Sequence, residues 1–249
     1  AFHKEFYGAS VGQAAFIGDF DPDAVSKKLT QHFGNWKNPK PYKRISYDYF
    51  DVPAVNQTFE TPDKANAFFL ARTNVKMNTS APDYPALQIA REVIGGGFLN
   101  SRLATRIRQK DGLSYGVGAG LQVSSIDEDG VFIANAIYAP ENRDKLEKAF
   151  REEIDRVIKD GITEDELKSV KQGYLLAQQR QRAAYSSIAS MWVNNLFLKR
   201  DFGWTSDLEK RIEALTVEQV NAAIKKYITA DKISVFKAGD FAKAAKAAQ

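Results

Sequence analysis

The chain contains no cysteine and only two histidines, and these absences narrow the chemistry open to it. Without cysteine it has no disulfide, no thiolate zinc ligand and no cysteine nucleophile. His3 and His32 lie far apart, and neither belongs to a His-x-x-Glu-His or His-Glu-x-x-His motif. We therefore expect no metal site within this chain; we also expect it to hold no bound cofactor and no catalytic residue.

Long apolar runs and a strong charge of one sign are also absent. Nothing in the sequence approaches the ~18 consecutive apolar residues of a membrane-spanning helix. The 35 Lys+Arg and 31 Asp+Glu give a formal net charge of only +4. So small an excess of positive charge is typical of a solvated surface. The sequence also lacks the stripe of basic and aromatic residues that is typical of a nucleic-acid site. We expect neither membrane insertion nor nucleic-acid binding.

What the chain does contain is an internal repeat. Residues 4–20 (KEFYGASVGQAAFIGDF) align without a gap with residues 225–241 (KKYITADKISVFKAGDF). Each copy has the pattern of a helix end, a short loop, a buried strand and a Gly-Asp turn into another helix. The repeat predicts that residues 1–36 are the C-terminal tail of a domain that precedes a second, similar one. The chain would then be part of a longer protein.

Residues 37–47 are polar, contain two prolines and are predicted to be a linker to one complete domain at 48–249. Strands are predicted over 56–60, 67–73, 113–123, 130–138 and 233–238. Helices are predicted over 83–93, from 100 or 101, and over 142–159, 163–186, 188–198, 206–214 and 216–227. Because strands and helices do not alternate one for one, the pattern favours an α+β fold, with helices packed on one face of a mostly antiparallel sheet.

Several of these helices begin with recognisable caps. Asp21 precedes Pro22 at the start of a helix expected over 24–33. Thr163 and Glu166 have the spacing of a capping box, and Thr216 is expected to cap the helix that follows it. These signals predict where the helices start.

Gly95, Gly96 and Gly97 follow the helix predicted over 83–93 and are expected to form a loop. They lack the Gly-Lys-Ser/Thr ending of a phosphate-binding loop, and a helix precedes them where that motif requires a strand. Two interpretations stay open. The glycines form a simple flexible turn, or their backbone is mobile or is approached closely by another part of the chain.

The segment after the glycines carries four cations, Arg102, Arg106, Arg108 and Lys110. For Arg102 and Lys110 we favour the interpretation that they lie on a solvated basic face, where their charges compensate the helix dipole. Arg108 differs, because a helix–turn–strand layout can bring it close to Tyr115. A guanidinium and a phenol side by side form a donor pair for a peptide carbonyl or its oxyanion. The chemistry alone leaves two interpretations of Arg108 open: it forms such a pair with Tyr115, or it belongs to the solvated basic face.

Residues 94–103 (IGGGFLNSRL), followed by 108–115 (RQKDGLSY), resemble the signature of the pitrilysin/insulinase (M16) family of zinc peptidases, in its non-catalytic C-terminal lobe. Further segments occur in the expected order: DKANA at 63–67, APEN at 139–142, GITEDEL at 161–167 and AGDF at 238–241. The resemblance covers essentially the whole chain and is greatest to the last part of long bacterial members with four repeated domains.

The resemblance implies a two-lobed zinc metalloendopeptidase, whose N-terminal lobe carries an inverted His-x-x-Glu-His zinc site and whose C-terminal lobe closes over it to form a chamber. Arg108 and Tyr115 match, in spacing and setting, an Arg–Tyr pair that binds the substrate backbone. We expect the N-terminal catalytic lobe of the same protein and a peptide substrate as partners, with zinc in the full-length protein. This chain alone is expected to be inactive, and the long bacterial relatives imply a periplasmic location.

A second interpretation stays open. Some members of this family have lost catalysis and survive as structural or assembly subunits. The presence of both Arg108 and Tyr115 favours the peptidase role, since a purely structural homologue need not keep the pair.

Overall fold

The computed structural model describes residues 2–247, which form two compact units. The first combines the residues up to Ser46 with residues 175–207, and the second combines residues 47–174 with those from Leu208 onward. Residues 175–207 thus group with the N-terminal segment. The domain boundaries at residues 36 and 47 that the repeat suggests remain a prediction.

The second unit is built on a five-stranded sheet with the order β1-β5-β2-β4-β3. Its strands are β1 (Asn56–Glu60), β2 (Ala67–Val75), β3 (Gly116–Val123), β4 (Gly130–Tyr138) and β5 (Ser234–Gly239). β1 and β5 pair in parallel, and the other three pairings are antiparallel. The predicted α+β class with a mostly antiparallel sheet is therefore confirmed.

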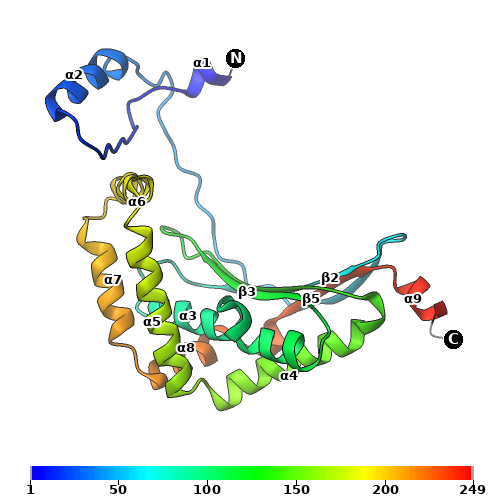
Figure 1. Ribbon diagram of the computed structural model, residues 1–249. Coiled ribbons are helices and arrows are strands. Elements are labelled where there is room, and N and C mark those ends of the chain that lie inside the picture. The colour runs from blue at the N-terminus through cyan, green and yellow to red at the C-terminus, as the bar shows by residue number, and fades with distance from the viewer. Residues whose placement is uncertain (1, 248–249) are drawn as a thin grey trace. The chain divides into compact units, whose positions relative to one another are not determined.

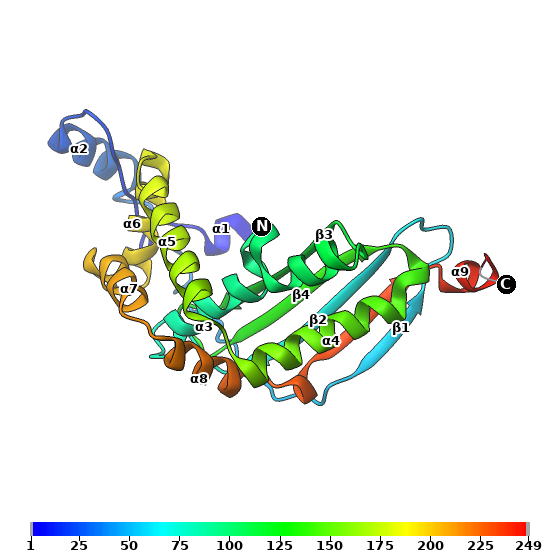
Figure 2. The ribbon, with the colours of Figure 1, turned by 60° about the horizontal axis from the view of Figure 1, so that its bottom comes forward.

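Helices cover one face of this sheet. In Figures 1 and 2, α3 (Tyr84–Arg91), α4 (Arg143–Asp160) and α8 (Val217–Tyr227) lie on the same side of the strands. β2 and β4 bury every second residue beneath them, as period-two alternation requires. Phe69 of β2 contacts Phe150 of α4, with ring centroids 5.1 Å apart. Burying such a side chain fully stabilises a fold by roughly 1.5–3 kcal/mol.

The opposite face of the sheet, which we call the open face, carries the alternate residues of the same strands. Phe68 of β2 is 43% exposed and Ile137 of β4 is 40% exposed. In β3, Gly116, Gly118 and Gly120 stand opposite Ile137, Asn135 and Ile133 and so belong to this face.

The predicted helix caps are confirmed. The Asp21 carboxylate accepts a hydrogen bond from Asp23 N at 2.9 Å and begins α2 (Pro22–Phe33). Thr163 N donates to Glu166 Oε2 at 2.8 Å, and Glu166 N donates to Thr163 Oγ1 at 3.2 Å, which starts α5 (Glu164–Gln181). Thr216 and Gln219 form the same reciprocal pair before α8.

The two copies of the repeat differ. The second copy contains β5, which is flanked by β1 and β2. The strand expected in the first copy is wrong: residues 2–46 contain α1 (Phe2–Phe6) and α2 but no strand, and none of them is buried. A strand needs neighbouring strands for its backbone hydrogen bonds, and the described part of this segment supplies none.

The first unit also contains α6 (Tyr185–Phe197) and joins the second through α5 and α7 (Gly203–Glu213). Asn38 ties its N-terminal segment together, donating to Phe6 O at 2.9 Å and accepting from Ser10 N at 2.9 Å. Large apolar side chains are nevertheless exposed in residues 2–46: Phe2, Phe6, Tyr7, Val11, Phe16, Phe20, Phe33, Trp36, Tyr42 and Ile45. This segment therefore has the composition of a core without its burial.

The loop predicted at Gly95–Gly97 is wrong for its first two residues. Gly95 and Gly96 lie in a π-helical turn, η1 (Glu92–Gly96), which continues α3. Gly97 ends it, and its N–H donates to Glu92 O at 2.9 Å. A Cβ on Gly95 would clash with the backbone nitrogen and Cβ of Ala119 in β3. Glycine is required here because a helix packs closely against a strand, which favours close approach over a simple flexible turn.

Candidate functional site

An open pocket of about 440 Å³ lies where β3 begins and β4 ends. Both of the predicted substrate-binding residues, Arg108 and Tyr115, line it. The rest of its lining is mostly apolar or glycine: Phe68, Leu99, Ala104, Gly116, Val117, Gly118, Asn135 and Ile137. The helix–turn–strand layout inferred from the sequence therefore does bring the guanidinium and the phenol to one pocket.

Arg108 belongs to a second π-helical segment, η3 (Ala104–Lys110), instead of the α-helix expected there. Its neighbour Ile107 is 1% exposed and anchors the segment in the core. The following turn is closed by two backbone bonds: Asp111 N donates to Arg106 O at 3.0 Å, and Leu113 N donates to Ile107 O at 2.9 Å. Arg108 thus projects from a firmly held backbone.

Leu99, in contrast, lies outside the core. Leu103 is fully buried, whereas Leu99 is 37% exposed and lies in a separate 3₁₀ turn, η2 (Phe98–Asn100). Leu99, Leu103 and Ile107 recur every four residues, but Leu99 lies in this separate turn and so does not share the buried face of the other two. Its side chain lines the pocket instead.

Tyr115 is 68% exposed, yet the backbone on both sides of it is fixed. The buried Ser114 hydroxyl donates to Ile137 O at 2.6 Å and accepts from Gly116 N at 3.1 Å. These bonds attach the start of β3 to the end of β4. The phenol therefore stands in solvent on a rigid base, where an arriving ligand can meet it.

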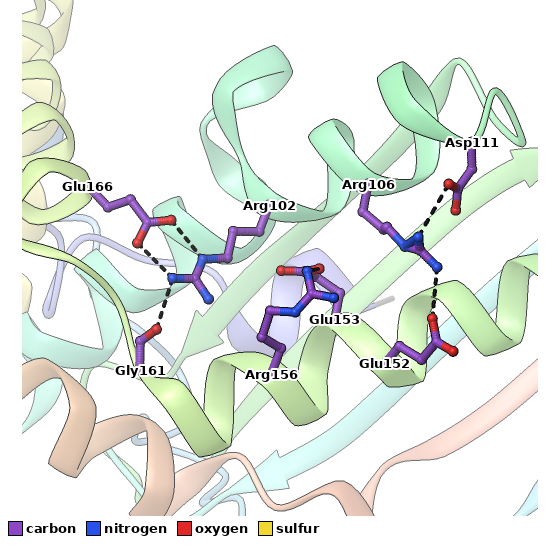
Figure 3. Close-up of polar contacts among 8 residues, drawn as sticks. All are labelled: Arg102, Arg106, Asp111, Glu152, Glu153, Arg156, Gly161 and Glu166. Carbon is purple, nitrogen blue, oxygen red and sulfur yellow. Dashed lines mark hydrogen bonds and ion pairs between the residues drawn. The ribbon is translucent and has the colours of Figure 1, made fainter.

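Two of the other cations form ion pairs that connect this segment to neighbouring helices (Figure 3). Arg102 makes a bidentate contact with Glu166, with both N–O distances 2.7 Å, and also donates to Gly161 O at 2.8 Å. Arg106 bridges Glu152 at 2.7 Å and Asp111 at 3.3 Å. The solvated face favoured for Arg102 is therefore wrong, because its side chain is only 15% exposed and is paired.

The contact between Arg102 and Glu166 shifts the pKa values of both groups. Burial alone would raise the pKa of Glu166, but hydrogen bonds from Arg102 and from the Thr163 backbone hold it below its usual value. The same carboxylate raises the pKa of Arg102. Both groups stay charged at neutral pH and fix the start of η3 relative to α5.

Asn135 is the site residue that the sequence reasoning missed. It is exposed on the open face of β4, and no described residue hydrogen-bonds its side-chain amide. The signal was present in the strand GVFIANAIY, where an amide interrupts an otherwise apolar run. This amide lines the same pocket as Arg108 and Tyr115.

The other end of the open face is crossed by residues 47–55. Asn74 of β2 donates its amide N–H to Phe50 O at 2.9 Å, and Lys232 contacts both carboxylate oxygens of Asp51 at 3.1 Å. Val235 N donates to Val55 O at 2.7 Å, where this segment leads into β1. Residues 47–55 thus partly cover the open face at one end, and the pocket lies at the other end.

Within residues 2–247, no three potential metal-ligating side chains come together. His3 stacks on Tyr7, with ring centroids 4.8 Å apart, and His32 lies in the last turn of α2. In the same residues, no helix has the length and apolar character needed to cross a bilayer.

Comparison with known proteins gives a consistent family. Residues 1–174 match the family model described as the peptidase M16 inactive domain. The "Non-peptidase homolog YmxG" of Helicobacter pylori is 22% identical over 210 residues, which is 84% of this chain and 47% of that protein. An "uncharacterized zinc protease" of Mycobacterium tuberculosis is 27% identical over 241 residues, 90% of this chain and 51% of that protein. The chain therefore spans about half the length of these relatives.

Solved structures share the fold. The peptidase M16 inactive domain from Pseudomonas fluorescens superimposes with a TM-score of 0.75 at 24% identity, covering 88% of this chain and 50% of that one. The periplasmic protease PqqL from Escherichia coli gives a TM-score of 0.65 at 20% identity over 89% of this chain and 24% of that one. The ferredoxin protease FusC, solved with Arabidopsis ferredoxin, gives 0.67 at 16% identity over 89% and 24%.

Proposed function

This chain belongs to the peptidase M16 family as its inactive, C-terminal domain, and from that premise we propose that it is the substrate-binding, chamber-forming lobe of a zinc metalloendopeptidase. The observation that carries the proposal is the meeting of Arg108 and Tyr115 at one open pocket. Tyr115 is not needed there to fill the core, since its side chain is largely exposed.

In this proposal, Arg108 and Tyr115 bind the carbonyl of the peptide bond to be cleaved. The guanidinium N–H groups and the phenol O–H donate hydrogen bonds to its oxygen, and they continue to do so as that oxygen becomes an oxyanion. Zinc in the partner lobe would supply the activated water. The rigid backbone around Ser114 holds the phenol in place, so that the donors need not reorganise during the reaction.

The partner of the lobe would be the N-terminal catalytic part of the same protein. Relatives about twice as long support this, as do the exposed aromatic side chains of residues 2–46. We place the tail of a preceding domain at residues 1–36, a linker at 37–47 and the complete C-terminal domain at 48–249. The likeness to PqqL supports a long bacterial protein in the periplasm, with a peptide as substrate.

A second candidate function is a structural or protein-interaction subunit without catalysis. The relative YmxG favours it, because that protein is named a non-peptidase homologue. Peptide hydrolysis by the chain joined to its proposed N-terminal lobe decides between the two. Zinc-dependent hydrolysis that a chelator abolishes supports the peptidase, and its absence supports the structural subunit.

The residue roles are tested by Arg108→Ala and Tyr115→Phe in that two-lobed protein. Each variant should lower kcat/KM about 100-fold, the cost of removing one donor from an oxyanion site. Zinc content and melting temperature should not change. Lys110→Ala is the matched control, because this exposed cation lies two residues from Arg108 and outside the pocket. If both pocket variants keep the wild-type kcat/KM, the assigned roles are wrong.

A further inference from the structure

The open face carries two asparagines, and one of them shows what such a residue can do. Asn74 on β2 donates its side-chain amide to the carbonyl of Phe50, at 2.9 Å. Phe50 belongs to a segment without helix or strand that crosses the face at residues 47–55. A side-chain amide on this face therefore already hydrogen-bonds the backbone of an extended segment that crosses it.

Asn135 on β4 is the counterpart of Asn74 at the pocket end of the face. Its neighbours in register are Leu70 on β2 and Gly118 on β3, and along its own strand Ile133 and Ile137. None of these side chains can hydrogen-bond. Among the described residues, the Asn135 amide has no partner at all.

The surroundings leave room for an extended peptide over Asn135. A Cβ placed on Gly116 would meet no atom within 4 Å, and one placed on Gly118 would meet the Gly95 carbonyl oxygen at 3.4 Å, an ordinary van der Waals distance. A peptide that lies on these glycines presents alternating N–H and C=O groups. An asparagine amide offers both donors and an acceptor, so that it can bind either group, or one of each.

We propose that Asn135 is a third substrate-binding residue, which hydrogen-bonds the backbone of an extended peptide next to the group held by Arg108 and Tyr115. The inference rests on the proposed function. Gly116, the residue after Tyr115, pairs with Ile137 of β4, and Asn135 lies two residues before Ile137 in the same strand. Because a strand rises ~3.3 Å per residue, Asn135 stands ~7 Å from that position and meets an extended peptide about two residues away.

The test is peptide binding to the isotope-labelled chain, followed by NMR. The probe is a capped peptide in which Thr-Val-Ser is repeated four times, since β-branched residues favour an extended backbone. Asn135→Leu removes the amide and keeps a similar size, and Asn135→Asp replaces the NH₂ donor with a charged carboxylate oxygen. Gln122→Leu is the matched control, because it removes an amide from the same face outside the pocket.

The proposal predicts that the peptide shifts the side-chain NH₂ signals of Asn135, which Asn135→Asp identifies by their loss. Asn135→Leu should weaken binding about fivefold to thirtyfold, as expected for one or two lost hydrogen bonds. Gln122→Leu should bind as the wild type does. All of these variants should keep the wild-type melting temperature, since both side chains are exposed.

Two further outcomes separate this inference from the proposed function. If Asn135→Leu binds as tightly as wild type while Arg108→Ala loses binding, the role of Asn135 is overturned and the peptide-binding lobe stands. If neither variant changes binding, or if the wild-type chain binds no peptide at millimolar concentration, both proposals are overturned.

Discussion

The two faces of the sheet use alternate residues of the same strands for different purposes. On the covered face, β5 contributes Lys237, which is 6% exposed and forms a buried ion pair with Glu147 of α4. On the open face, β4 contributes Asn135, exposed and without a hydrogen-bond partner among the described residues. Most polar groups buried in a fold have a partner there, whereas a polar group in solvent is available to bind a ligand. Substitutions on the covered face should therefore change stability, and those on the open face should change binding.

The largest effect is expected at the buried ion pair. Lys237→Met should lower the free energy of unfolding by about 3 kcal/mol, because it leaves Glu147 buried without its closest cation. This loss of stability lies at the lower end of the range for breaking a buried ion pair, because Arg151 still contacts Glu147 at 2.9 Å. Urea unfolding followed by circular dichroism measures it.

The double variant Lys237→Met with Glu147→Leu is the control for this measurement. Replacing both charges with apolar side chains should recover most of the lost stability. If the single variant is as stable as wild type, the ion pair does not hold β5 to α4.

A smaller loss is expected at the contact between helix and strand. Gly95→Ala should destabilise the chain by about 2 kcal/mol, because the new Cβ overlaps the backbone of Ala119 and forces η1 away from β3. Gly116→Ala is the matched control, since its Cβ would meet nothing and should change the melting temperature little. Equal melting temperatures for the two variants would contradict the close packing at Gly95.

The smallest effect is a pH dependence from the Arg102–Glu166 ion pair. Because the pKa of Glu166 is lowered in the folded state, its carboxylate stabilises the fold above its ordinary pKa of 4.5. That stability is lost as the pH falls below 4.5 and the carboxylate takes up a proton. Glu166→Gln should cost about 1.5 kcal/mol at pH 7, as expected for charged hydrogen bonds, and less below pH 4.5.

Melting curves of wild type and Glu166→Gln from pH 7 to pH 3.5 measure this difference. Glu164→Gln, at an exposed neighbouring carboxylate, supplies the control. A gap between wild type and Glu166→Gln that stays constant with pH would show that the Arg102–Glu166 pair has no such role.

Local signals predicted much of the fold. The strands at 56–60 and 130–138 have the predicted bounds, and β5 follows the prediction to within one residue. The caps at Asp21, Thr163 and Thr216 could also be predicted from the sequence, because a cap depends on residues only a few positions apart. Such features need no knowledge of what lies across the molecule.

Features that depend on distant neighbours were missed. Gly95 reads as a loop residue, and only its contact with Ala119 explains a glycine inside a π-helical turn. Arg102 reads as a solvated cation until Glu166, 64 positions later, pairs with it. The first copy of the repeat has the sequence of a buried strand, but without neighbouring strands in the described residues it forms none.

The sequence by itself determined the family, the α+β class and the two residue types that can bind a peptide carbonyl, because these depend on motifs and on local periodicity. Only the tertiary structure decided that Arg108 and Tyr115 meet at one pocket and that Asn135 joins them. Strand order and register set which residues share a face, and those depend on pairings between segments far apart in the chain.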